Sequence, residues 1–155
     1  MKPSIQLSMN KVLKLSNVLI ARVDIAEKDM NLGKLAIQME NYIKSKGVTP
    51  IGPLIQRSSF YIDGEGKIDI NFYLLRQANN FIHNVEIPYK MESIVRVPNC
   101  IYARYIGPEE NLKFAYDKIN VTAFEEDIVL SNENYTVFVD QEEDNIVADV
   151  FVEKK

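Results

Sequence analysis

Two arginines occupy matching places in a repeated pattern of residues. Arg22 and Arg104 stand 82 residues apart, and each is preceded by Ala and, five positions earlier, by Asn. A guanidinium carries five N–H donors that fit carboxylate or phosphate oxygens. These arginines could therefore bind an anionic ligand, or they could pair with carboxylates of the chain such as Asp69 and Asp149. Structural pairing is the simpler of the two interpretations.

The other residues that often carry chemistry are isolated in the sequence. His83 is the only histidine and Cys100 the only cysteine, which leaves a tetrahedral zinc site without its ligands. No serine stands in a Gly-x-Ser-x-Gly elbow. Gly64-Glu65-Gly66 is flanked by acids that would repel phosphate. We expect no metal and no cofactor. Whether the protein is an enzyme stays open, and we favour the interpretation that it is not one.

Composition narrows the class of protein. The chain has 155 residues, 46% of them hydrophobic, which suits one compact domain or two fused subdomains. The net charge of −4 offers no broad basic surface, so we expect no direct contact with nucleic acid. No apolar run reaches the roughly 18 residues of a membrane span, and a single cysteine allows no internal disulfide. We expect a soluble, cytoplasmic protein with no membrane partner.

The first half of the chain predicts a strand, a helix and a hairpin. A weak strand near 11–15 precedes a β-branched strand over 18–25. Apolar residues at spacings of three and four predict a helix that ends at Gly47: they are Leu32, Leu35, Ala36, Met39 and Ile43. An extended segment over 54–62, a turn at Gly64 and Gly66, and a returning strand over 68–74 complete the half. In that last strand Ile68, Ile70, Phe72 and Leu74 share one face.

The second half repeats this order. Two extended runs over 91–97 and 100–106 are separated by Pro98-Asn99, and Gly107-Pro108 then opens a helix with acids in its first turn. The end of that helix is left open, because residues 120–122 are poor helix formers. Strands over 135–139 and 146–152 make the closing hairpin.

The shared order predicts a duplicated α+β unit, with repeats at about 8–77 and 90–154 inside a single domain spanning 1–155. Aligning the two closing strands on their apolar faces places Asn71 with Asp149 and Tyr73 with Phe151, at an offset of 78 residues. Two such units predict an antiparallel sheet, pseudo-two-fold symmetry and a central groove in which a ligand would bind.

Several features resemble the gyrase-inhibitor-like (GyrI-like) bacterial effector-binding domains. They are the run Val97-Pro98-Asn99-Cys100-Ile101-Tyr102-Ala103-Arg104-Tyr105-Ile106-Gly107-Pro108, the segment 47–53 and the strand Ile68-Asp69-Ile70-Asn71-Phe72-Tyr73. The resemblance covers nearly the whole chain and rests on the order of features. In many members the domain follows a DNA-binding helix-turn-helix. This sequence shows none, so we expect a stand-alone sensor or sequestering protein.

The resemblance implies a groove lined by aromatic side chains, with an acidic residue that receives an amphipathic or cationic small molecule. Asp149 is the positional match to that acid. Aromatic faces and a carboxylate attract an organic cation. The ligand-binding candidates are Asp149, Tyr61, Tyr73, Tyr102, Tyr105, Tyr135 and Phe151, with Asn71, Arg22 and Arg104 as polar partners.

Plainer interpretations stay open beside this one. The tyrosines could be packed strand residues, and Phe60, Phe72, Phe114 and Phe138 could be ordinary core. Asp149 could be a solvated acid or the partner of an arginine. The alternative function is a protein-binding module with a collapsed groove, which uses an exposed strand or the acidic turn over 141–145. The absence of tryptophan, and of the family's proline at the strand ends, favours that alternative.

Overall fold

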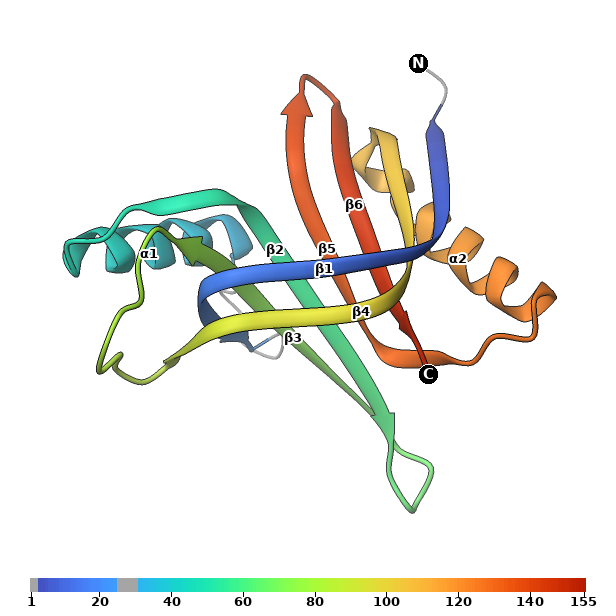
Figure 1. The fold of residues 1–155 in the computed structure, drawn as a ribbon, viewed down its shortest axis with the longest axis horizontal. Helices are drawn as coiled ribbons and strands as arrows, with labels where there is room; N and C mark the ends of the chain where they lie inside the picture. Colours follow the sequence, from blue (N-terminus) through green and yellow to red (C-terminus); the bar gives the residue numbers. More distant parts are fainter. Residues whose placement is uncertain (1–2, 25–30) are drawn as a thin grey trace. The chain divides into compact units, whose positions relative to one another are not determined.

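The computed structural model describes residues 3–24 and 31–155. These residues form six strands and two α-helices, with one short 3-10 helix (Figure 1). The elements are β1 (Ser4–Val23), α1 (Leu32–Ser45), β2 (Pro50–Ile62), β3 (Ile68–Ala78), β4 (Tyr89–Pro108), η1 (Glu109–Asn111), α2 (Lys113–Glu125), β5 (Leu130–Glu142) and β6 (Asn145–Lys154). They divide into two compact units. Unit 1 takes the residues up to Leu13 together with Val97–Lys155, and unit 2 takes Lys14–Arg96.

In unit 2, β3 pairs antiparallel with β1 on one side and with β2 on the other. The helix predicted after the first strand is confirmed. Asn31 caps it by accepting a hydrogen bond from the Lys34 N–H at 3.1 Å, and Gly47 follows it with a φ of 76°. Met39 and Ile43 of α1 pack against β1 and β3 residues in a core with Leu19, Ala21, Val23, Leu74, Ala78 and Ile82.

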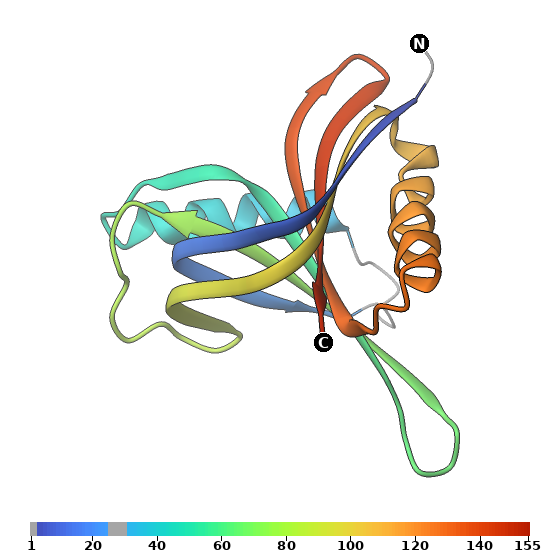
Figure 2. The ribbon, with the colours of Figure 1, turned by 45° about the vertical axis from the view of Figure 1, so that its right-hand side comes forward.

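The hairpin of β2 and β3 extends beyond α1 in both views (Figures 1 and 2). Its turn forms because the Asp63 carboxylate accepts hydrogen bonds from the N–H groups of Glu65 and Lys67, both at 2.9 Å. Ile68 and Ile70 continue the face on which Leu74 is buried, but they lie past the helix and are 61% and 48% exposed.

In unit 1, β6 pairs antiparallel with β4 and with β5. Ala115, Ile119 and Ala123 of α2 pack at a spacing of four against strand residues, in a core with Ile101, Ala103, Tyr105, Ile146, Ala148, Val150 and Val152. The helix predicted to start directly after Pro108 begins later, because Glu109–Asn111 first forms a 3-10 turn. Residues 120–122 lie inside α2, where core packing outweighs their weak helix propensity.

The strand breaks predicted before Val18 and at Pro98-Asn99 do not occur, since β1 and β4 each run for 20 residues. At these places Asn17 and Asn99 adopt left-handed φ values of 51° and 54°. Asparagine tolerates this conformation better than most residues. The repeated asparagine therefore has a conformational role in both strands.

The two units share further backbone features. At the end of α1 the Val48 N–H donates a hydrogen bond to the Ile43 carbonyl. At the end of α2 the Ile128 N–H donates to the Ala123 carbonyl in the same way. In each unit a backbone hydrogen bond also joins the end of the last strand to the segment after the helix. The Asn79 N–H donates to the Thr49 carbonyl in unit 2, and the Lys155 N–H donates to the Val129 carbonyl in unit 1. These parallels agree with the predicted duplication, which itself stays a prediction.

Strand register corrects the predicted alignment of the two halves. The pairing of β1 and β2 with β3 matches the pairing of β4 and β5 with β6. In this match, β1 residues correspond to β4 residues 82 positions later, and β2 residues to β5 residues 80 positions later. Residues of β3 then correspond to β6 residues 76 positions later. Tyr73, opposite Arg22, therefore stands where Asp149 stands opposite Arg104. The predicted equivalence of Asn71 with Asp149, and of Tyr73 with Phe151, does not fit these registers.

The phenylalanines considered as ordinary core divide into two pairs. Phe72 and Phe138 pack against the cores of unit 2 and unit 1. Phe60 and Phe114 are 48% and 46% exposed, so that interpretation is wrong for them.

Gly107 has a packing role. Tyr105 and Gly107 lie on the same face of β4, and the Tyr105 hydroxyl donates to the carbonyl of Pro108 at 2.5 Å. A Cβ at position 107 would come within 2.7 Å of that hydroxyl and 3.2 Å of the Pro3 backbone. The tyrosine ring thus takes the space that a side chain would occupy, which explains the glycine before Pro108.

We expect Gly107→Ala to lower the free energy of unfolding by about 1–3 kcal/mol, because the added methyl displaces a fully buried ring. Urea unfolding of the wild type and the variant measures this difference. Gly64→Ala is the matched control, since nothing lies within 4 Å of its added Cβ. Equal losses in the two variants would contradict the packing role.

Candidate functional site

The face of the unit 1 sheet that is turned away from α2 carries charged and aromatic residues. Because side chains alternate along a strand, the residues between the core positions of β4 and β6 point away from the helix. Register places Tyr102, Phe151 and Tyr135 in one row across β4, β6 and β5. The next row on this face holds Arg104 and Asp149, directly opposite each other.

Asp149 is held by two neighbours on β4. Arg104 donates from Nε to Oδ1 at 2.8 Å and from Nη2 to Oδ2 at 2.9 Å, which is a two-pronged ion pair. The Tyr102 hydroxyl donates to Oδ1 at 2.8 Å. The Asp149 side chain is 13% exposed and the Arg104 side chain 39%. The carboxylate is thus covered while the arginine still faces solvent in part.

The charges shift the acid–base behaviour of both neighbours. The hydrogen bond and charge of Asp149 raise the pKa of Arg104, so this guanidinium stays cationic at every accessible pH. Burial and the hydrogen bond to Asp149 raise the pKa of Tyr102. Tyr102 therefore remains a neutral phenol and a hydrogen-bond donor well into the alkaline range.

Aromatic contacts extend from this network. The rings of Tyr102 and Phe151 lie 5.0 Å apart at an angle of 50°, a tilted pair. The ammonium of Lys11 lies 5.7 Å from the Tyr102 ring centroid, within the range of a cation–π contact. Tyr135 is buried and donates from its hydroxyl to Glu133 at 2.8 Å. With Lys11, the formal charge of the Arg104–Asp149 network becomes +1.

Four of the predicted residues lie in unit 2. Arg22 donates from Nη2 to Asn71 Oδ1 at 2.8 Å, and Asn71 donates to the Tyr61 hydroxyl at 3.2 Å. The Tyr73 ring lies against the guanidinium of Arg57, with the guanidinium carbon 4.3 Å from the ring centroid. These residues form a network of their own.

Tyr105 does not join either network. It points to the α2 side of β4, where it is fully buried and bonded to Pro108. Tyr102 and Tyr105 are three residues apart, an odd spacing that puts them on opposite faces of a strand.

Sequence analysis missed Lys11 and Arg57 as members of these networks. Lys11 falls in the weakly predicted first strand, and Arg57 in the predicted extended segment over 54–62. Each is a single cation among strand residues, and its contact to a tyrosine depends on strand register. No pattern in the sequence marked these two contacts.

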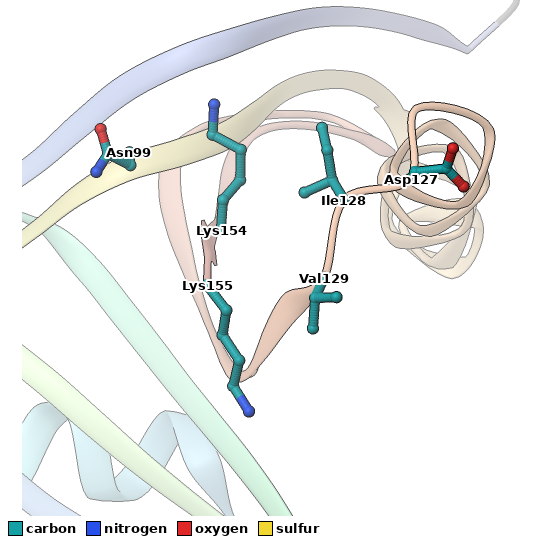
Figure 3. A pocket seen from close by; sticks show the side chains of 6 residues that line it. All are labelled: Asn99, Asp127, Ile128, Val129, Lys154 and Lys155. Atoms are coloured by element: carbon teal, nitrogen blue, oxygen red, sulfur yellow. The ribbon is translucent and has the colours of Figure 1, made fainter.

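A hollow of about 490 Å³ lies elsewhere in unit 1 (Figure 3). It is lined by Asn99, Asp127, Ile128, Val129, Lys154 and Lys155. Figure 3 shows the two lysine side chains extending in opposite directions, and Lys154 donates to Asn10 at 2.7 Å. The lysines therefore do not converge on one point in this hollow, and none of the predicted site residues lines it.

Metal ligands do not cluster in residues 3–24 and 31–155, where no group of three or more His, Cys, Asp or Glu side chains could hold an ion. Burial raises the pKa of the Cys100 thiol to about 11. At neutral pH Cys100 is therefore a thiol and a poor nucleophile. Within the same described residues, no helix has the length and apolar character needed to cross a membrane.

We expect Tyr102→Phe to lower the free energy of unfolding at pH 7.5 by about 1 kcal/mol, through loss of the hydrogen bond to Asp149. Because folding raises the pKa of this phenol, its contribution is complete below pH 10, the ordinary tyrosine value, and declines as the pH rises above it. The difference between the wild type and Tyr102→Phe should therefore shrink above pH 10 in urea unfolding.

Tyr61→Phe serves as control, because that hydroxyl accepts a hydrogen bond from an amide and donates to no carboxylate that the described part of the structure shows. A Tyr102→Phe difference that stays constant from pH 7.5 to pH 11 would contradict the proposed donation to Asp149.

Solved structures of EcmrR share the fold of this chain. The crystal structure of the EcmrR C-terminal domain has a TM-score of 0.63 at 18% sequence identity, covering 100% of this chain and 99% of that one. The cryo-EM structure of an EcmrR–DNA complex has a TM-score of 0.64 at 16% identity, covering 97% of this chain. The present chain spans 58% of the length of EcmrR in that complex.

The structure of SAV2435 bound to tetraphenylphosphonium is more distant, with a TM-score of 0.49 at 7% identity. No model of a known protein family matches the sequence, and no curated protein matches it either. The likeness to EcmrR concerns the fold alone. In its order of strands and helices, the chain has the α+β fold of the EcmrR C-terminal domain.

Proposed function

We propose that this protein binds an amphipathic organic molecule on the aromatic face of unit 1, as a sensor or sequestering protein of the effector-binding kind. The observation that supports this function is the row of Tyr102, Phe151 and Tyr135 beside the paired carboxylate of Asp149. The fold of the EcmrR C-terminal domain and the sequence resemblance to gyrase-inhibitor-like domains support the same function. We also propose that the two halves of the chain are duplicates of one α+β unit.

The Arg104–Asp149 ion pair affects how a cationic ligand can bind. Both carboxylate oxygens of Asp149 are already occupied, so a ligand cation has to compete with the Arg104 guanidinium. Arg104 is the more exposed partner and has a flexible stem, so it is the group that moves. A cation that replaces it regains the charge of Asp149 and adds contacts with the aromatic rings.

A neutral ligand does not compete with Arg104 for Asp149. An uncharged aromatic molecule leaves the Arg104–Asp149 pair intact and gains only stacking and apolar contact with the half-buried Tyr102, because Phe151 behind it is buried. Ligand charge is therefore the variable that separates the two modes. A matched pair of probes, benzyltrimethylammonium and benzyl alcohol, differs in this charge.

We expect Arg104→Gln to tighten binding of benzyltrimethylammonium by about tenfold, because the variant removes the internal competitor for Asp149. Asp149→Asn should remove most of the affinity for the cation, and neither change should alter the affinity for benzyl alcohol by more than about twofold. Calorimetric titration measures both affinities, and thermal unfolding checks that each variant is folded.

Arg96→Gln is the matched control, since Arg96 is an exposed arginine of the same strand. It carries the same change of charge at another position, so its affinity for the cation should stay at the wild-type value. If Arg104→Gln binds the cation no better than Arg96→Gln does, competition at Asp149 is wrong. If wild type and Arg104→Gln bind neither probe, the proposed function is wrong.

A further inference from the structure

The row of unit 2 that matches the ion pair of unit 1 contains no carboxylate. Register places Arg22, Tyr73 and Arg57 side by side across β1, β3 and β2. Tyr73 stands at the place of Asp149, and Arg57 at the place of Val137. The row in unit 1 has a formal charge of zero, and the row in unit 2 has a charge of +2.

Arg57 has an unsatisfied donor. Its guanidinium carbon lies 4.3 Å from the Tyr73 ring centroid, a cation–π contact that fixes the plane of the group. Its Nε is buried and makes no hydrogen bond in the described residues. A buried N–H of a charged group without an acceptor is costly, and a ligand that supplies an acceptor recovers that cost.

Arg22 has only a neutral partner in the described part of the chain, the amide oxygen of Asn71. Asn71 is 6% exposed and is itself fixed by the Tyr61 hydroxyl, so it orients the guanidinium and does not neutralise it. The nearest carboxylate on this face of β3 is Asp69, four residues from Tyr73 and so about 13 Å away along the strand. No ion pair joins it to either arginine in the described residues.

We propose that this row of unit 2 binds an organic anion, with a carboxylate, sulfonate or phosphate group as the recognised chemistry. The flat, multiply donating guanidinium suits such groups because it can hold two of their oxygens at once. Arg57 supplies the preoriented donor, Arg22 supplies the second charge from the neighbouring edge of β3, and Tyr73 supplies the ring between them. The site lies in the other unit from the proposed cation site and selects the opposite charge.

Benzenesulfonate is the probe, because it joins one anionic group to one ring. Calorimetric titration of the full chain should show binding of benzenesulfonate and weaker binding of benzyl alcohol. Arg57→Gln and Arg22→Gln should each weaken benzenesulfonate binding about tenfold or more, as expected for loss of a charge-assisted hydrogen bond. Lys34→Gln, the same change of charge at an exposed position of α1, should leave the affinity unchanged.

Arg57→Met gives a second readout that separates a binding role from a structural one. Methionine keeps an apolar stem and removes the unsatisfied N–H, so the ligand-free variant should melt at the wild-type temperature or higher. The stabilisation of the wild type by benzenesulfonate should be lost in this variant. A lower melting temperature together with unchanged benzenesulfonate binding would show a structural arginine and overturn the proposal.

Two further outcomes would also overturn it. One is no binding of benzenesulfonate by the wild type, and the other is binding that Lys34→Gln weakens as much as Arg57→Gln does. Neither outcome bears on the cation titrations of Arg104→Gln, so failure of this site and failure of the proposed function are distinguishable.

Discussion

Each helix covers one face of the strands in its own unit, and the alternation of side chains then decides which residues remain for the other face. In unit 1, α2 takes Ala103, Tyr105, Ala148 and Val150 into its core. The residues between them, Arg104 and Asp149 among them, must point the other way. The charged network therefore depends on the apolar packing behind it, because a shift of one residue in register would exchange the two sets.

The same constraint explains why two similar units present different chemistry. Leu74 and Val150 occupy matching core positions, and both are fully buried. Tyr73 and Asp149, one residue earlier, are free of that packing requirement and differ in charge. The matching rows thus hold a neutralised pair in unit 1 and two cations in unit 2. These two core positions are apolar in both units, while the positions beside them on the opposite face differ in charge.

Local patterns in the sequence predicted local structure well. The stripe from Leu35 to Ile43 predicted α1, because helical periodicity needs only neighbouring residues. The glycines after Ile62 predicted the hairpin turn for the same reason. The repeated Asn and Arg predicted a duplication, which stays a prediction, but both asparagines do share a left-handed φ.

Pairing between distant residues could not be predicted in this way. The register of β2 against β3 shifts between Ile51 and Ile55, where Gly52 has a φ of 70°. Gly52 and Pro53 mark an irregularity in the strand, but they do not say which residues pair on either side of it. The alignment of Asn71 with Asp149 failed because it assumed matching faces without knowing the pairing. The choice of Arg104 as the partner of Asp149 was left open for the same reason. The alternation of side chains within one strand could be predicted from the sequence. It would have placed Tyr102 and Tyr105 on opposite faces.

Unit 1 is assembled from segments that lie far apart in the chain. Ile5, Leu7 and Met9 of β1 pack against a core whose other members come from residues after position 100. During synthesis at about 5–20 residues per second, the whole of unit 2 emerges before that core exists. The first strand segment therefore waits for several seconds with apolar side chains exposed. Residues 14–96, which make up unit 2, are all available in this interval, so the core of unit 2 is the one that can form first.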